Sequence, residues 1–207
     1  MNFLAHAVLA GSSAERIVGS MAGDFVKGVL YEANFQPEFL LGLRLHRRID
    51  AFSNQQPILR QSAKRLPAHL QRLAAPCIDM MADHFLACHA QTNPGAYLPA
   101  IEGQLKSNLS LVDYEKALHQ ILGQHKTMLG EDAVRFFSHA KATHLFSDYQ
   151  NFKRIERSIL YLCKRLGQNE RGEEMINALA EQFEGLSEDF LNYWPSLKAE
   201  ANRFLKP

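Results

Sequence analysis

Cysteine is scarce in this chain, and its scarcity excludes several kinds of protein. The 207 residues include three cysteines, which lie far apart at Cys77, Cys88 and Cys163. An odd number at such spacing suits neither the disulfide framework of a small secreted domain nor a structural zinc cluster. We therefore expect the protein to reside in a reducing compartment, namely the cytoplasm.

Long apolar runs are also missing. A membrane-spanning helix needs about 20 consecutive apolar residues, and no stretch of this sequence approaches that length. The opening MNFLAHAVLAGSSA looks superficially like a signal sequence, but His6 interrupts its apolar run and no basic residue precedes Arg16. We expect this segment to belong to the mature protein, and the protein to be soluble.

Neither sign of charge dominates the chain. Lysine and arginine number 23 against 22 aspartates and glutamates, so the overall charge gives no reason to expect a nucleic-acid partner. A charged partner would have to be attracted by a local patch. The sequence also lacks a glycine-rich nucleotide loop, a serine nucleophile elbow and a catalytic cysteine pattern, which excludes several common enzyme classes.

Apolar residues at helical spacing are the main positive feature. They make up 46% of the chain, which is enough for one core, whereas alternating runs of Val, Ile and Thr are absent. The sequence predicts a single all-α domain over residues 1–207, with Ser12 and Ser13 able to cap its second helix and Pro37 in the first turn of its third. The helices are expected over residues 3–10, 13–29, 37–53, 57–65, 67–74, 77–90, 97–107, 112–129, 131–138, 147–166 and 171–204.

Polar residues enter the apolar stripes of two of these helices. Phe39, Leu43, His46 and Asp50 follow a 4-3-4 spacing, which places them on one helical stripe that begins apolar and ends polar. In the 13–29 segment, Asp24 occupies a stripe position where an aliphatic residue would be expected. Both patterns place ionisable side chains against the core.

Ionisable residues also lie beside apolar ones at two other places. His6 follows Phe3 by three residues, and Asp83 and His84 flank an apolar stripe. Each could be an ordinary hydrogen-bonded core side chain. Several buried carboxylates with imidazoles, however, require a compensating positive charge, and a hard or borderline divalent cation supplies it. We therefore predict a metal site, with manganese, iron or magnesium favoured, formed by His6, Asp24, His46, Asp50, Asp83 and His84.

Four short segments carry a resemblance to a known family. They are NFLAH at residues 2–6, GDFV at 23–26, HRRID at 46–50 and DMMADHFL at 79–86. In this order they resemble the acyl carrier protein phosphodiesterase family, over about the first ninety residues. The resemblance implies an all-helical fold like that of the HD phosphohydrolases, and a manganese-supported hydrolysis that converts holo acyl carrier protein to the apo form and releases 4'-phosphopantetheine. The chain departs from the HD hallmark, because Asp83 precedes His84 instead of following it.

The resemblance also implies roles for other residues. Asp24, Asp50 or Asp79 would accept a proton or orient a ligand, and the guanidinium groups of Arg47 and Arg48 would hold the phosphate oxygens. Acyl carrier proteins are acidic, so a basic docking patch is expected near the site. Its candidates are Lys27, Arg44, Arg47 and Arg48.

Two other interpretations remain open at this point. The same metal ligands would serve another HD-type phosphohydrolase that acts on a nucleotide or a small phosphate ester. Alternatively, the chain is a non-catalytic helical module that binds an acidic protein, and the histidines and aspartates form buried hydrogen-bond networks. Neither interpretation involves a membrane.

Overall fold

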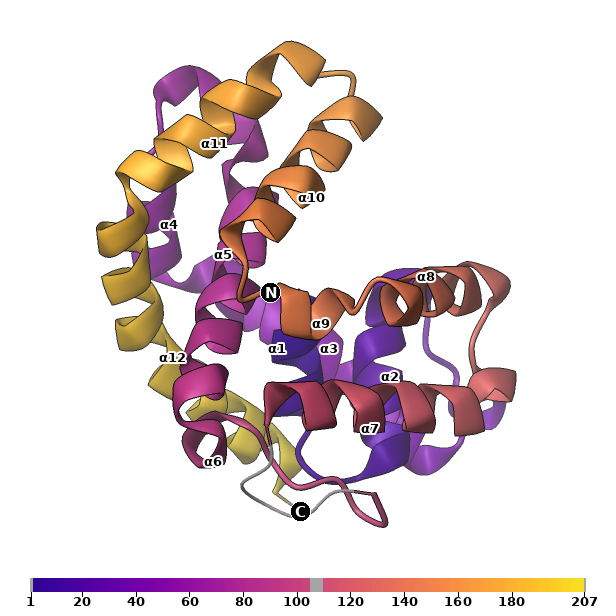
Figure 1. Cartoon of the computed structure of the whole chain (residues 1–207). Coiled ribbons are helices and arrows are strands. Elements are labelled where there is room, and N and C mark those ends of the chain that lie inside the picture. Colours follow the sequence, from indigo (N-terminus) through magenta and orange to yellow (C-terminus); the bar gives the residue numbers. More distant parts are fainter. Residues whose placement is uncertain (1, 105–109, 207) are drawn as a thin grey trace.

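The prediction of an all-α fold is confirmed. The computed structural model describes residues 2–104 and 110–206, and these residues form α-helices and short 3-10 helices without a strand (Figure 1). The α-helices are α1 Phe3–Leu9, α2 Ala14–Ala22, α3 Pro37–Gln55, α4 Pro57–Lys64, α5 Gln71–Thr92, α6 Pro94–Tyr97, α7 Leu111–Gln124, α8 Glu131–Ala142, α9 Leu145–Asp148, α10 Phe152–Arg165, α11 Gly172–Glu181 and α12 Phe183–Leu205. The 3-10 helices are η1 Gly23–Phe25, η2 Glu32–Asn34, η3 Ala68–Leu70, η4 Lys126–Met128 and η5 Asn169–Arg171.

Helices α2 and α3 pack unusually closely, and two glycines make this approach possible. A Cβ atom on Gly19 would lie 2.1 Å from the carbonyl oxygen of Phe39, and one on Gly42 would lie 2.2 Å from that of Arg16. Both contacts are with backbone, which cannot move aside easily. The absence of two side chains therefore fixes the position of α3, which carries His46 and Asp50, against α2.

Helix α12 covers another side of α3. The hydroxyl groups of Tyr193 and Ser53 are 2.6 Å apart, and buried Glu200 accepts hydrogen bonds from Arg48 of α3 and from Arg203. The result is that α3 is held between α2 and α12.

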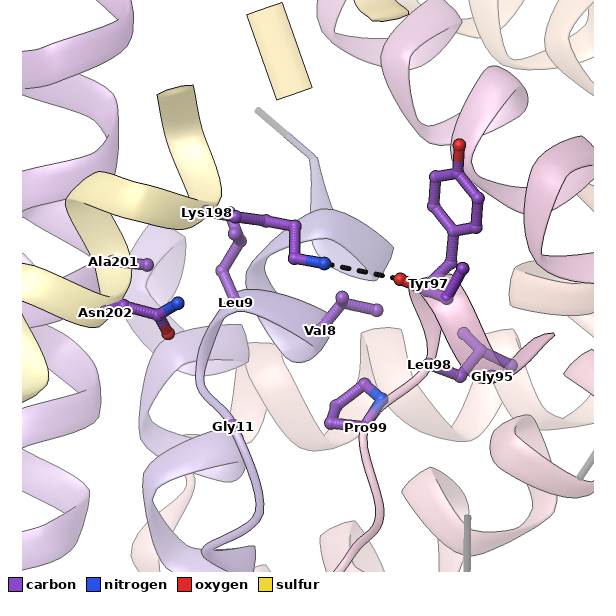
Figure 2. Close-up of a pocket in the computed structure, with 11 residues that line it drawn as sticks. Val8, Leu9, Gly11, Gly95, Tyr97, Leu98, Pro99, Lys198, Ala201 and Asn202 are labelled. Atoms are coloured by element: carbon purple, nitrogen blue, oxygen red, sulfur yellow. Dashed lines mark hydrogen bonds between the residues drawn. The ribbon is translucent and has the colours of Figure 1, made fainter. Parts of the chain in front are cut away.

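The C-terminal part of α12 also reaches α1 and α6. Lys198 Nζ donates to the carbonyl oxygen of Ala96 at 3.3 Å. Figure 2 draws this bond as a dashed line beside a small cavity, whose volume is about 210 Å³. None of the helices in the described ranges is both long enough and apolar enough to cross a membrane.

Several expected helix boundaries are wrong. The 13–29 helix ends at Ala22 and continues only as η1; Val26 is extended and Gly28 has a φ of +79°, which is not helical. The expected 97–107 helix is replaced by α6, which begins at Pro94, before the expected start, and Pro99 disfavours a helical conformation at Leu98. Residues 105–107 of that prediction lie outside the described residues.

Other differences concern where helices join or divide. The 67–74 and 77–90 predictions merge into η3 and α5, because α5 continues through Pro76 despite the lost backbone hydrogen bond. The 147–166 prediction divides into α9 and α10, and the side chain of Asn151 caps α10. The 171–204 prediction divides at Gln182. Both expected helix starts, the Ser13 cap and Pro37 in the first turn, are confirmed.

Candidate metal centre and its groove

Two histidines and an aspartate meet between α1 and α3. The rings of His6 and His46 stack with their centroids 3.9 Å apart. Asp50 lies one helical turn after His46, and its two carboxylate oxygens are each 3.2 Å from an Nε2 atom, one of His6 and one of His46. The three side chains can place one ligand atom each within 4.8 Å of one another. Asp24 of η1 adds a carboxylate oxygen 3.7 Å from His46 Nε2.

The backbone of α2 and η1 orients these rings. His46 Nδ1 lies 2.9 Å from the carbonyl oxygen of Ser20, so Nδ1 carries the proton and Nε2 faces the two carboxylates. A Cβ atom on Gly23 would lie 2.2 Å from the His46 ring, so only glycine lets η1 pass there. The Ser20 hydroxyl donates to the carbonyl oxygen of His6 at 3.0 Å, which ties α1 to the same turn.

His6 has the properties of a neutral metal ligand. It is almost completely buried, and burial lowers its pKa to about 4, assisted by the nearby His46. Neither ring nitrogen has a hydrogen bond of good geometry within the described chain, although Nε2 is close to Asp50. A buried imidazole without such a bond is costly, and a cation at Nε2 would satisfy it.

The electrostatics around His46 also call for a positive charge. Burial alone would lower the pKa of His46, but hydrogen bonding to Asp24 and Asp50 outweighs burial and raises the pKa to about 9. The close contacts with the imidazoles of His46 and His6 likewise overcome burial and hold the pKa of Asp50 well below its usual range. The carboxylates are therefore ionised, and either a proton on His46 or a metal cation must balance them.

Asp83 and His84 lie elsewhere. Asp83 is completely buried, and its two carboxylate oxygens accept the backbone amides of Leu4 and Ala5 at 2.9 and 3.0 Å. It thus caps the first turn of α1 from α5. His84 Nδ1 bonds the carbonyl oxygen of Tyr149 at 2.7 Å. Of the six expected ligands, the structure brings together His6, Asp24, His46 and Asp50.

The arginines expected at the phosphate, Arg47 and Arg48, are already engaged, as is Arg44 of the expected docking patch. Arg48 forms an ion pair with buried Glu200 at 2.5 Å, and Arg44 forms one with Glu32 at 2.8 Å. Arg47 donates to the carbonyl oxygen of Val26 at 3.2 Å. The structure therefore provides no cluster of these three guanidinium groups around the histidines.

A groove with a cavity volume of about 1080 Å³ opens beside the candidate ligands. Asp24, Asp50 and Asp79 line it together with Lys27, and the half-exposed Asp24 and Asp50 connect the buried histidines to it. Its further walls come from α4, α5, α8 and α10. Sequence reasoning missed the contribution of α4 and α10, because only tertiary packing brings those helices to the site.

Comparison with known proteins identifies the family. The family model described as acyl carrier protein phosphodiesterase matches residues 1–197. An acyl carrier protein phosphodiesterase of Escherichia coli (strain K12 / DH10B) is 26% identical over 209 residues, which cover 98% of each chain. One of Yersinia pestis is 34% identical over 100 residues, which cover 48% of this chain and 51% of that protein. No solved structure matches. The chain belongs to the acyl carrier protein phosphodiesterase family.

Proposed function

We propose that this protein hydrolyses the phosphodiester between 4'-phosphopantetheine and the serine of holo acyl carrier protein. The family match over residues 1–197 supports the substrate, and the named relatives are phosphodiesterases of acyl carrier protein. The observation that carries the chemistry is the His6–His46–Asp50 group, which reaches a large groove through Asp50. The cytoplasm is the proposed location.

A divalent metal ion is part of this proposal. His6, His46 and Asp50 would hold it, and Asp24 is close enough to His46 to contribute. Such an ion polarises a phosphoryl oxygen and lowers the pKa of water. Two imidazoles with carboxylates suit manganese or iron better than magnesium, which prefers oxygen ligands alone. Manganese is the first choice.

Asp24 is the proposed proton acceptor. Its side chain is 53% exposed and lines the groove, whereas the histidines are buried. Hydrogen bonding to His46 lowers the pKa of Asp24, so the carboxylate is ionised and can accept a proton from water as the water attacks phosphorus. The bond between phosphorus and the serine oxygen breaks, and that oxygen takes up a proton. Asp79, which also lines the groove, is the proposed second carboxylate for orienting the substrate.

Intact-mass spectrometry of holo acyl carrier protein tests this function. The wild-type protein with manganese should remove the phosphopantetheine mass, and a chelator should stop the reaction. His46→Gln should abolish it, whereas His69→Gln serves as a matched control, because His69 is exposed and pairs with Glu174.

Other results would contradict the proposal in different ways. An unchanged carrier protein with metal-dependent hydrolysis of nucleotides or small phosphate esters would favour another HD-type phosphohydrolase. Binding of the carrier protein without any hydrolysis would favour the binding-module interpretation.

A further inference from the structure

The groove contains cations that the protein itself does not neutralise. Within the described residues, Lys27, Arg60 and Arg165 form no ion pair, and all three line the groove. Arg44 and Arg48, which do not line it, are paired with glutamates. Three cations that remain available for an external anion therefore line the groove.

These cations lie on separate walls. Arg60 is on α4 and Arg165 is the last residue of α10, while Lys27 follows η1. Helices α5 and α10 contact each other, and both contribute residues to the lining of the groove. Cations that line different walls of a wide groove suit an extended acidic surface better than one small anion, which needs converging donors.

The size of the groove supports a macromolecular occupant. Its volume of about 1080 Å³ is at or above the upper end for small-molecule pockets, which is roughly 1,000 Å³. Asp50 belongs to the His6–His46–Asp50 group, Asp24 lies 3.7 Å from His46, and Asp132 is paired with Arg135. The basic residues of α4 and α10 are therefore available to an acidic partner.

Helix α10 also presents an aromatic side chain to the groove. Tyr161 is 67% exposed and precedes Arg165 by one helical turn, so the two share a face. Tyrosine and arginine are the residue types most enriched among the energetic anchors of protein interfaces. Their pairing on an uncovered face indicates a docking surface.

We propose that Arg60, Tyr161 and Arg165, with Lys27, dock the acidic face of the carrier protein beside the metal group. This inference rests on the proposed function, because the carrier protein is the occupant to which it commits. Arg60, Arg165 and Lys27 supply the positive charge that complements an acidic protein. The docking surface differs from the patch expected from sequence, of which only Lys27 remains.

Binding of apo acyl carrier protein tests this docking surface without any turnover. Fluorescence anisotropy at low salt should show binding to the wild-type protein. The double variant R60E/R165E should bind about tenfold more weakly or worse, and Tyr161→Ala should also weaken binding. Lys126→Glu is the matched control, because Lys126 is an exposed cation on η4 that does not line the groove.

Circular dichroism and thermal melting verify that each variant is folded, and R60Q/R165Q provides a milder second variant. Equal affinity of the wild-type protein and R60E/R165E would overturn the inference, as would a wild-type protein that does not bind. Carrier-protein binding that depends on Arg60 and Arg165, without hydrolysis of the holo form, would sustain the docking surface and refute the proposed function. Hydrolysis of the holo form by the wild-type protein, together with unchanged affinity in the variants, would support the proposed function and refute the docking surface.

Discussion

The carboxylate of Asp83 accepts the backbone amide of Ala5, the residue immediately before His6, although 78 positions separate the two in the chain. Its other oxygen accepts the amide of Leu4. Through these two bonds α5 fixes the start of α1, and α1 presents His6 to His46 and Asp50. Asp83 therefore supports the candidate His6–His46–Asp50 metal group without belonging to it.

Asp83→Ala should consequently weaken both folding and metal binding. Two buried amides lose their acceptor, which should cost about 1–3 kcal/mol in the free energy of unfolding. Displacement of α1 should also reduce the affinity for manganese. Denaturant unfolding and a manganese titration on the folded variant check the two effects. Loss of manganese with unchanged stability would instead indicate that Asp83 is a direct ligand.

The stability of the protein should depend on pH through the same residue. Burial raises the pKa of Asp83 to about 7 in the folded state, against the opposing effect of its two amide donors, whereas the ordinary value is 3.8. Between these values the folded state holds the proton that the unfolded state has released. The stability contribution of Asp83 should therefore fall by about 1.4 kcal/mol per pH unit as the pH rises from 4 to 7.

Asp83→Asn isolates this effect, because the asparagine does not titrate and the other groups are retained. As the pH rises from 4 to 7, the unfolding free energy of the wild-type protein should fall relative to that of Asp83→Asn. A difference that is constant with pH would contradict the assigned pKa.

Gly23 should be essential for the position of His46. A methyl group at this position would lie 2.2 Å from the His46 ring, so Gly23→Ala should displace the ring and weaken manganese binding while leaving most helices intact. Isothermal titration calorimetry and circular dichroism measure these properties. Gly123→Ala is the control, because a Cβ atom there meets nothing within 4 Å and alanine should favour α7. Normal manganese affinity in Gly23→Ala would contradict the geometry.

Arg48 should act in stability and not in phosphate binding. Its guanidinium pairs with Glu200, which is 2% exposed and retains Arg203 as a second partner. Arg48→Ala should therefore lower the unfolding free energy by about 1–3 kcal/mol and leave kcat for holo acyl carrier protein near its wild-type value. Thermal melting and steady-state kinetics test the two parts. A large fall in kcat with unchanged stability would indicate that Arg48 binds the phosphate, as the sequence analysis predicted.

Local sequence patterns predicted the part of the site that lies on one helix. His46 and Asp50 are separated by one turn, so helical periodicity alone places both on the inward stripe of α3. The patterns could not separate Asp83 from a metal ligand, because a carboxylate that caps a distant helix and one that binds a cation are both buried beside apolar residues. The partners of Arg48 and Asp83 lie 152 and 78–79 positions away, and only tertiary structure reveals them.

Helix boundaries were less predictable than helix identity for a related reason. Pro76 normally ends a helix, yet packing of α5 against its neighbours maintains the helix through it. At Gln182 the reverse occurs. The apolar pattern predicts one continuous helix, but the structure divides it into α11 and α12. The docking residues of α4 and α10 were missed because they become neighbours only after these helices pack around α5.

The most direct test of the account is manganese binding measured by electron paramagnetic resonance on four folded proteins. These are the wild type, His6→Gln, His46→Gln and His84→Gln. If the His6–His46–Asp50 group holds the metal, the first two variants should lose stoichiometric manganese while His84→Gln retains it, because His84 is bonded to Tyr149. Retention of manganese by His46→Gln, together with its loss from folded His84→Gln, would contradict the assignment and move the metal site to α5.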